Sequence, residues 1–151
     1  MSTLNLMSVP LVIVDGANVV GSVPDGWWRD RAGAAIRLRD RLAALDGFAD
    51  LPGPVEIVLV VEGRARDIPE TTGVRVARAP GSGDDTIVDL VAAAPDRQVV
   101  VVTADRGLRA RVVALGAEVR GPSSVPRGDG AGPGARYSGQ RGKSGPYRGG
   151  E

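Results

Sequence analysis

Short runs of branched apolar residues alternate along this chain with segments of mixed polarity. The runs are too short to cross a membrane, and polar residues do not alternate within them. This pattern is typical of strands that helices cover on both faces. We expect strands over residues 9–14, 55–61, 74–77, 98–103 and 118–120.

Helical periodicity fills the intervals between these runs. In each amphipathic segment, apolar residues recur on one face of a period of about 3.6 residues. The pattern predicts helices over residues 30–45, 84–94 and 105–115, with Gly116 closing the last one. Residues 15–25, rich in glycine and turn formers, are expected to form a loop. The order of elements predicts the α/β class, with a small doubly wound parallel sheet.

The pattern ends near residue 120. We expect residues 1–120 to form one domain and residues 121–151, which hold 10 of the 22 glycines, to be a disordered tail. The tail carries five basic and two acidic residues, a net charge of +3, whereas residues 1–120 carry 14 basic and 16 acidic residues, a net charge of −2. Its arginines and tyrosines, spaced by glycine, resemble RGG-type RNA-binding segments. A solubilising tail without a specific partner explains them equally well.

Acidic residues follow the predicted strands at the point where each strand ends. Asp15, Glu62 and Asp105 come directly after apolar runs, and Asp84 and Asp85 open a predicted helix. The ends of parallel strands meet at one edge of a sheet, where ligands bind in open α/β folds. Carboxylates gathered there repel each other unless a cation lies among them. The sequence therefore predicts a divalent metal site, and such sites commonly handle phosphates.

Each of these acids also has an ordinary structural explanation. Asp84 and Asp105 precede helices and could be N-caps, and Asp15 before a glycine could form a turn. Asp89 lies one helical turn after Asp85, so it could be a further metal ligand, hold a water beside the metal, or be a surface residue. Asn18 could orient Asp15 or a water molecule, or bond to its own backbone.

Composition removes many alternatives. The chain contains no cysteine and no histidine, which excludes disulfides, thiolate zinc sites and His-dependent triads. We therefore expect hydrolysis by this chain to be metal-assisted, through aspartate and glutamate side chains. The first ten residues carry no lysine or arginine, so no signal peptide is indicated, and a cytoplasmic location is the expectation.

Three motifs together resemble the NYN branch of the PIN-like nucleases, and above all its bacterial YacP-like group. They are Val-Asp-Gly-Ala-Asn-Val-Val from residue 14, Gly-Asp-Asp-Thr-Ile from residue 83, and Val-Thr-Ala-Asp-Arg-Gly from residue 102. The resemblance covers roughly residues 9–120 and leaves the tail outside. It implies a Rossmann-like (PIN-like) fold and a ribonuclease that depends on Mg²⁺ or Mn²⁺.

Carried over by position, the resemblance assigns metal ligands at Asp15, Asp85 and Asp105, with Asn18 in support. The doubled acid leaves open whether Asp84 or Asp85 is the ligand. Glu62 stands where many relatives carry aspartate, so its part in the metal site is less defined.

Several residues near the predicted edge are candidates for contact with RNA. Arg64, Arg66 and Arg106 could clamp phosphate, or be exposed solubilising arginines. Thr103 could bond a ligand carboxylate or the scissile phosphate. Trp27 and its neighbour Trp28 could stack on bases or pack at the start of the following helix.

These observations favour a metal-dependent endoribonuclease. Two alternatives use the same chain differently: a nucleoside triphosphate pyrophosphohydrolase with the same acidic site, and a non-catalytic RNA-binding protein. RNA is the expected partner, and a ribosome or another RNA–protein complex is a further candidate.

Overall fold

The computed structural model describes residues 9–126 apart from 24–25, 49, 52 and 64–66. The last 25 residues, where the RGG-like motifs lie, are outside the described part, as are Arg64 and Arg66. In the described part, no helix is long and apolar enough to span a membrane.

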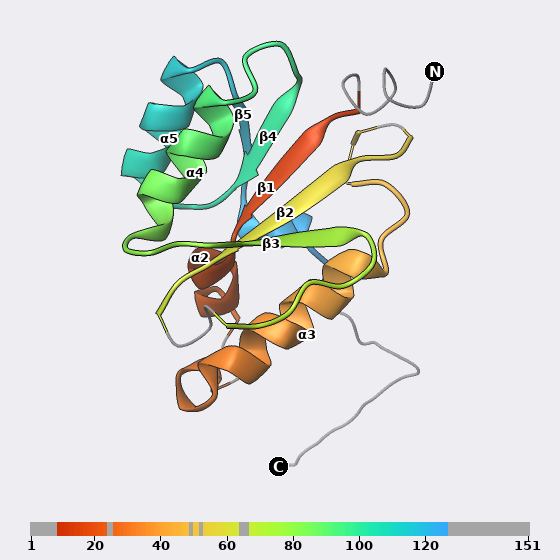
Figure 1. The fold of residues 1–151 in the computed structure, drawn as a ribbon, viewed down its shortest axis with the longest axis vertical. Helices are drawn as coiled ribbons and strands as arrows, with labels where there is room; N and C mark the ends of the chain where they lie inside the picture. The colour runs from red at the N-terminus through yellow and green to blue at the C-terminus, as the bar shows by residue number, and fades with distance from the viewer. Residues whose placement is uncertain (1–8, 24–25, 49, 52, 64–66, 127–151) are drawn as a thin grey trace.

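Five parallel strands form a single sheet in the order β3-β2-β1-β4-β5 (Figure 1). The predicted doubly wound α/β fold is confirmed, and each predicted strand is present within a few residues of its expected bounds. The strands are β1 (Leu11–Asp15), β2 (Glu56–Val61), β3 (Val74–Arg78), β4 (Val99–Val102) and β5 (Glu118–Arg120).

All the predicted helices are present, and the structure adds one that was not expected. The helices are α2 (Gly16–Gly21), α3 (Arg31–Ala43), α4 (Gly83–Ala92) and α5 (Arg106–Ala114), with 3-10 turns η1 (Trp27–Arg29) and η3 (Pro122–Ser124). The prediction of a loop over residues 15–25 was wrong where α2 forms. Its glycines and valines have low helix propensity, but Asp15 caps its first turn and Val19 is buried in the core.

Both faces of the sheet are covered, which explains why its central strands are apolar throughout. In β1, Val12 and Val14 pack in the core on the α3 side, whereas Leu11 and Ile13 pack in the core beneath α4 and α5. Figure 1 shows α4 and α5 on one face and α3 on the other. Successive side chains of a strand point to opposite faces, so an uninterrupted apolar run supplies both cores.

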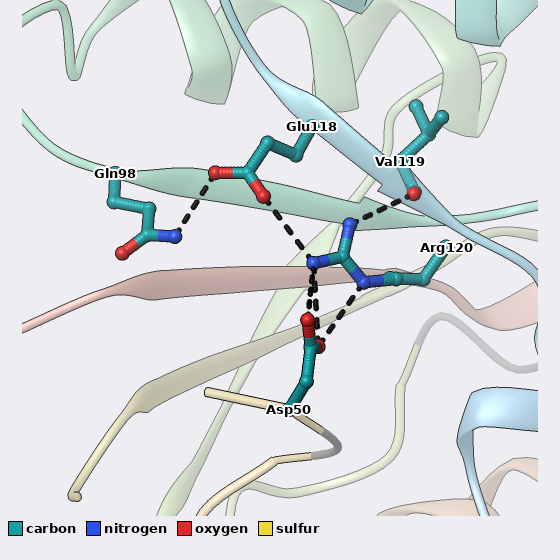
Figure 2. A network of polar contacts seen from close by, with 5 residues as sticks. All are labelled: Asp50, Gln98, Glu118, Val119 and Arg120. Carbon is teal, nitrogen blue, oxygen red and sulfur yellow. Dashed lines mark hydrogen bonds and ion pairs between the residues drawn. The ribbon is translucent and has the colours of Figure 1, made fainter. Parts of the chain in front are cut away.

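The fold continues past the boundary predicted at residue 120. Val125 follows η3 and is only 5% exposed, packed in the core on the α3 side. Figure 2 shows how the end of β5 is held: the Arg120 guanidinium pairs with Asp50 at 3.0 Å and with Glu118 at 3.3 Å. The domain therefore includes residues 121–126, which the sequence pattern assigned to the tail.

Candidate functional site

The candidate site lies at the switch point of the sheet. From β1 the chain builds the sheet outward through β2 and β3, then returns to the other side of β1 to add β4 and β5. The ends of β1 and β4 are therefore neighbours, with Val14 level with Val102. Ligands of open α/β sheets bind at this position.

Asp15 is the last residue of β1, and hydrogen bonds to both of its carboxylate oxygens fix its side chain. Its side chain is buried, and its Oδ2 accepts a hydrogen bond from the Thr103 hydroxyl at 2.9 Å. Its Oδ1 accepts from the Asn18 backbone N–H at 3.4 Å, which caps α2. A Cβ at Gly16 would lie 2.5 Å from the carbonyl oxygen of Val60, so only glycine lets α2 start this close to β2.

The loop after β4 is fixed to the same carboxylate. Thr103 is fully buried, and its Oγ1 also accepts from the backbone N–H of Asp105 at 3.1 Å. The Asn18 side chain accepts from the backbone N–H of Ala104 at 2.9 Å. Thr103 thus bonds a carboxylate and does not face solvent, and the Asn18 side chain holds the neighbouring loop while its backbone holds Asp15.

Asp105 caps α5, as its position in the sequence allowed. Its Oδ1 accepts from the Leu108 backbone N–H at 3.0 Å. Gly116 follows that helix with a φ of 95°, which confirms the predicted closing glycine.

At the start of α4, the structure gives Asp84 and Asp85 different surroundings, which the sequence alone did not distinguish. Ser82, and not Asp84, is the N-cap, because its side chain accepts from the Asp84 backbone N–H at 3.1 Å. The Asp85 side chain is 71% exposed and pairs with Arg111 of α5 at 3.1 Å. Asp84 is more buried than Asp85, and Asp89 is exposed.

The directions of the pKa shifts indicate which acids at this edge repel one another. Burial raises the pKa of Asp15, hydrogen bonds from Thr103 and Asn18 oppose that rise, and repulsion from Asp84 and Glu62 adds to it. The pKa of Asp84 is also raised, first by burial and then by repulsion from Asp105, although Arg111 opposes the shift. The acids that act on one another at this edge are Asp15, Glu62, Asp84, Asp105 and, with a smaller effect on Asp84, Asp85.

Glu62 completes the edge beside α4. Its Oε2 accepts from the Gly83 backbone N–H at 3.2 Å. A Cβ at Gly83 would lie 2.6 Å from that oxygen, so glycine permits the approach. Glu62 therefore holds the start of α4 against the end of β2.

These acids do not form a closed metal cage. Within the described residues, no group of three or more acidic side chains is gathered tightly enough to hold a metal ion by itself. Mg²⁺ commonly uses one or two carboxylates together with water and substrate phosphate oxygens. An open edge of mutually repelling carboxylates fits that manner of binding, and the assignment of the metal ligands remains a prediction.

The predicted phosphate-binding residues are only partly placed. Arg106 is exposed at the first position of α5, next to Asp105. The structure also brings Arg31 to this side of the molecule, beside the Trp27 ring, which the sequence analysis did not single out. The sequence carries no clear signal for this contact, because Trp27 and Arg31 lie on separate elements divided by the non-helical Asp30.

Together, the fold and the edge define a small doubly wound α/β protein with an acidic site at its switch point. No protein-family model matches the sequence, and no curated protein matches it. The structure is similar to the crystal structure of Rae1 (YacP) from Bacillus subtilis (W164L mutant), with a TM-score of 0.59 and 18% sequence identity over 78% of this chain and 72% of that one. The protein therefore has a YacP-like fold.

Proposed function

We propose that this protein is a metal-dependent endoribonuclease that hydrolyses RNA phosphodiester bonds at the switch-point edge. The observation that carries the proposal is the buried Asp15 carboxylate, held by Thr103 and facing the repulsion of Asp84 and Glu62. The YacP-like fold and the motif resemblance support the same function. Because the chain contains no cysteine and no histidine, hydrolysis would have to use other groups. Among the described residues, these carboxylates are the best placed.

The chain's own residues would hold the site ready for substrate. Thr103 and Asn18 fix the orientation of the Asp15 carboxylate. Asp84 repels Asp15 and is itself repelled by Asp105, so a cation bound at this edge together with substrate phosphate would relieve that repulsion. A bound Mg²⁺ or Mn²⁺ would neutralise phosphate charge and activate water. We prefer Asp84 to Asp85 as a ligand, because Asp85 turns outward to Arg111.

RNA would reach this edge through cationic groups around it. Arg106 is exposed there, and the net positive charge of residues 121–151 would add affinity for the RNA backbone. The pyrophosphohydrolase alternative would use the same carboxylates on a smaller substrate, and the tail favours RNA over a free nucleotide. A ribosome or another RNA–protein complex as the place of action remains a prediction from the sequence.

The decisive experiment measures cleavage of labelled single-stranded and structured RNA with Mg²⁺ or Mn²⁺, with a nucleoside triphosphate panel in parallel. We expect metal-dependent RNA cleavage that Asp15→Asn and Asp84→Asn abolish and that Asp85→Asn leaves nearly intact. Triphosphate turnover without RNA cleavage would favour the pyrophosphohydrolase. RNA binding without turnover of either substrate would favour the non-catalytic binding protein.

The fold of the Asp15→Asn variant provides an internal control. Because burial raises the pKa of Asp15, ionising this group costs more free energy in the folded than in the unfolded protein. Folding stability therefore falls as pH rises from the unfolded pKa to the raised folded pKa of this group. A neutral amide of the same shape removes this cost, but it keeps only one of the two oxygens that accept hydrogen bonds from Asn18 and Thr103. We expect the two effects to oppose each other, so that the inactive variant remains folded at neutral pH in thermal melting.

A further inference from the structure

A small cavity adjoins the acidic edge on its α3 side. It lies between α2, the start of α3 and the end of β2, and its wall includes Ala17, Val20, Trp27, Arg31 and Glu62. Gly16, which directly follows Asp15, also lines it. The cavity and the acidic edge therefore share a boundary, so a ligand could occupy both together.

The size of the cavity restricts what it can hold. Its volume is about 170 Å³, close to the ~150 Å³ of an apolar protein cavity that takes benzene. Sites for drug-sized ligands start near ~300 Å³. One planar ring system fits, while a sugar and a phosphate would remain outside, toward the acids.

The walls suit a nucleobase. The Arg31 guanidinium lies 5.0 Å from the centroid of the Trp27 ring, and bases stack on both aromatic rings and guanidinium planes. Glu62 supplies a carboxylate, which accepts hydrogen bonds but cannot donate them. Its Oε2 already accepts from the Gly83 N–H, and Oε1 has no such partner among the described residues.

Trp27 lies against α2 and lines the cavity, whereas its neighbour Trp28 does not line it. The Trp27 ring edge packs over α2, where a Cβ at Gly21 would lie 3.8 Å from Cζ2. Trp28 crosses it edge-on with centroids 5.9 Å apart, is 53% exposed and does not line the cavity. Packing at the helix start and contact with a ligand are therefore compatible roles for Trp27.

We propose that this cavity takes one unpaired RNA base next to the cleaved bond, with Trp27 as its stacking surface and Glu62 as an acceptor for its N–H groups. The inference rests on the proposed function for the identity of the RNA. It implies that the bound base presents an N–H donor toward Glu62, because a carboxylate accepts hydrogen bonds and cannot donate them.

The test measures binding separately from cleavage. The full chain carrying Asp15→Asn is titrated with a short single-stranded RNA, and two further variants each keep one tryptophan as the fluorescent reporter. With Trp28→Phe, we expect saturable quenching of Trp27; with Trp27→Phe, we expect little change in Trp28. Trp27→Ala should weaken binding roughly tenfold or more, as loss of one base–aromatic stack does, and Trp28→Ala less than twofold.

RNAs with a single abasic ribose at successive positions locate the bound base. One abasic position should weaken binding as much as Trp27→Ala does, and combining the two should add little. Equal losses for Trp27→Ala and Trp28→Ala, or no sensitive abasic position, would overturn the proposal. So would a nucleoside monophosphate that quenches Trp27 with the same affinity as the RNA.

The outcomes separate the subsite from the nuclease. If Trp27→Ala changes neither the rate of RNA cleavage nor the affinity for RNA, the proposed base-binding cavity is refuted while the proposed nuclease activity stands. If the wild type binds a base at Trp27 but does not cleave RNA, the proposed base-binding cavity stands and the proposed nuclease activity is refuted. Melting curves for Trp27→Ala and Trp27→Phe identify any loss that comes from unfolding, since phenylalanine retains an aromatic ring there.

Discussion

The Thr103 hydroxyl makes a sharp test of how the site is held, because a single atom joins Asp15 to the loop after β4. Thr103→Val keeps the shape of the side chain and removes the hydroxyl. Two hydrogen bonds are lost: the one to the Asp15 carboxylate at 2.9 Å and the one from the Asp105 N–H at 3.1 Å. Both lie in a site where the threonine itself is fully buried.

The cost follows from the kind of each bond. A hydrogen bond to a charged group contributes about 1.5–3 kcal/mol and an ordinary one about 0.5–1.5 kcal/mol. We therefore expect Thr103→Val to lower the free energy of unfolding by about 3 kcal/mol at neutral pH. For a domain of this size, that loss is roughly 10–15 °C in the melting temperature.

The loss should also depend on pH, with a defined sign. The Thr103 hydrogen bond lowers the pKa of Asp15 while burial raises it, so removing the bond raises that pKa further. Ionising Asp15 then costs the folded protein more, and the difference in stability between variant and wild type should widen as pH rises through the raised pKa values of Asp15 in the two folded proteins. At acid pH the carboxyl is neutral in both states, and we expect a loss smaller by about 1 kcal/mol.

Chemical denaturation of both proteins at pH 4 and pH 8 measures the effect, with Thr103→Ser as the matched control. Serine keeps the hydroxyl and removes one buried methyl, which costs about 1 kcal/mol without pH dependence. A valine variant within about 0.5 kcal/mol of the wild type, the usual range for a surface substitution, would refute the reasoning. Equal losses at the two pH values would show that the charge of Asp15 is not involved.

Two further predictions concern the frame of the site. Gly16→Ala places a methyl 2.5 Å from a backbone carbonyl oxygen and should cost about 2 kcal/mol or more, whereas Gly21→Ala, whose Cβ meets an ordinary contact at 3.8 Å, should be neutral in thermal melting. Truncation after Arg120 removes the buried Val125 and should lower the free energy of unfolding by about 2 kcal/mol. Truncation after Pro126 should leave the melting temperature unchanged and weaken RNA binding. A fall in melting temperature on truncation after Pro126 would show that residues 127–151 contribute structural contacts.

The fold was largely predictable because hydrophobic periodicity is a local signal. Uninterrupted apolar runs identified the strands, and Leu38 and Leu42 on one helical face identified α3. Helix α2 escaped because its glycines and valines favour other structures, and contacts distant in sequence decide its conformation. Val125 escaped for the same reason, since its burial depends on the α3-side core.

The site was predictable in position and less so in detail. The ends of parallel strands meet at one edge, so the position of Asp15 and Asp105 at that edge could be predicted from the sequence alone; their role as metal ligands stays a prediction. Choosing between Asp84 and Asp85 required the cap at Ser82 and the ion pair with Arg111. The ion pair is not visible in the sequence, because it depends on how α4 and α5 pack together. The Ser82 cap is a local contact, but Asp84 was also a possible cap in the sequence.

The structure also changes how the two explanations of each acid relate. A metal-binding role was weighed against a helix cap for Asp105 and against a turn for Asp15, and the structure shows that both side chains cap helices at the acidic edge. A cap bond fixes one carboxylate oxygen and so orients the other. Asp→Ala variants would therefore lose helix stability and charge together, with a capping cost of about 1 kcal/mol. Asp→Asn variants keep a capping oxygen, so they isolate the charge on which the proposed chemistry depends.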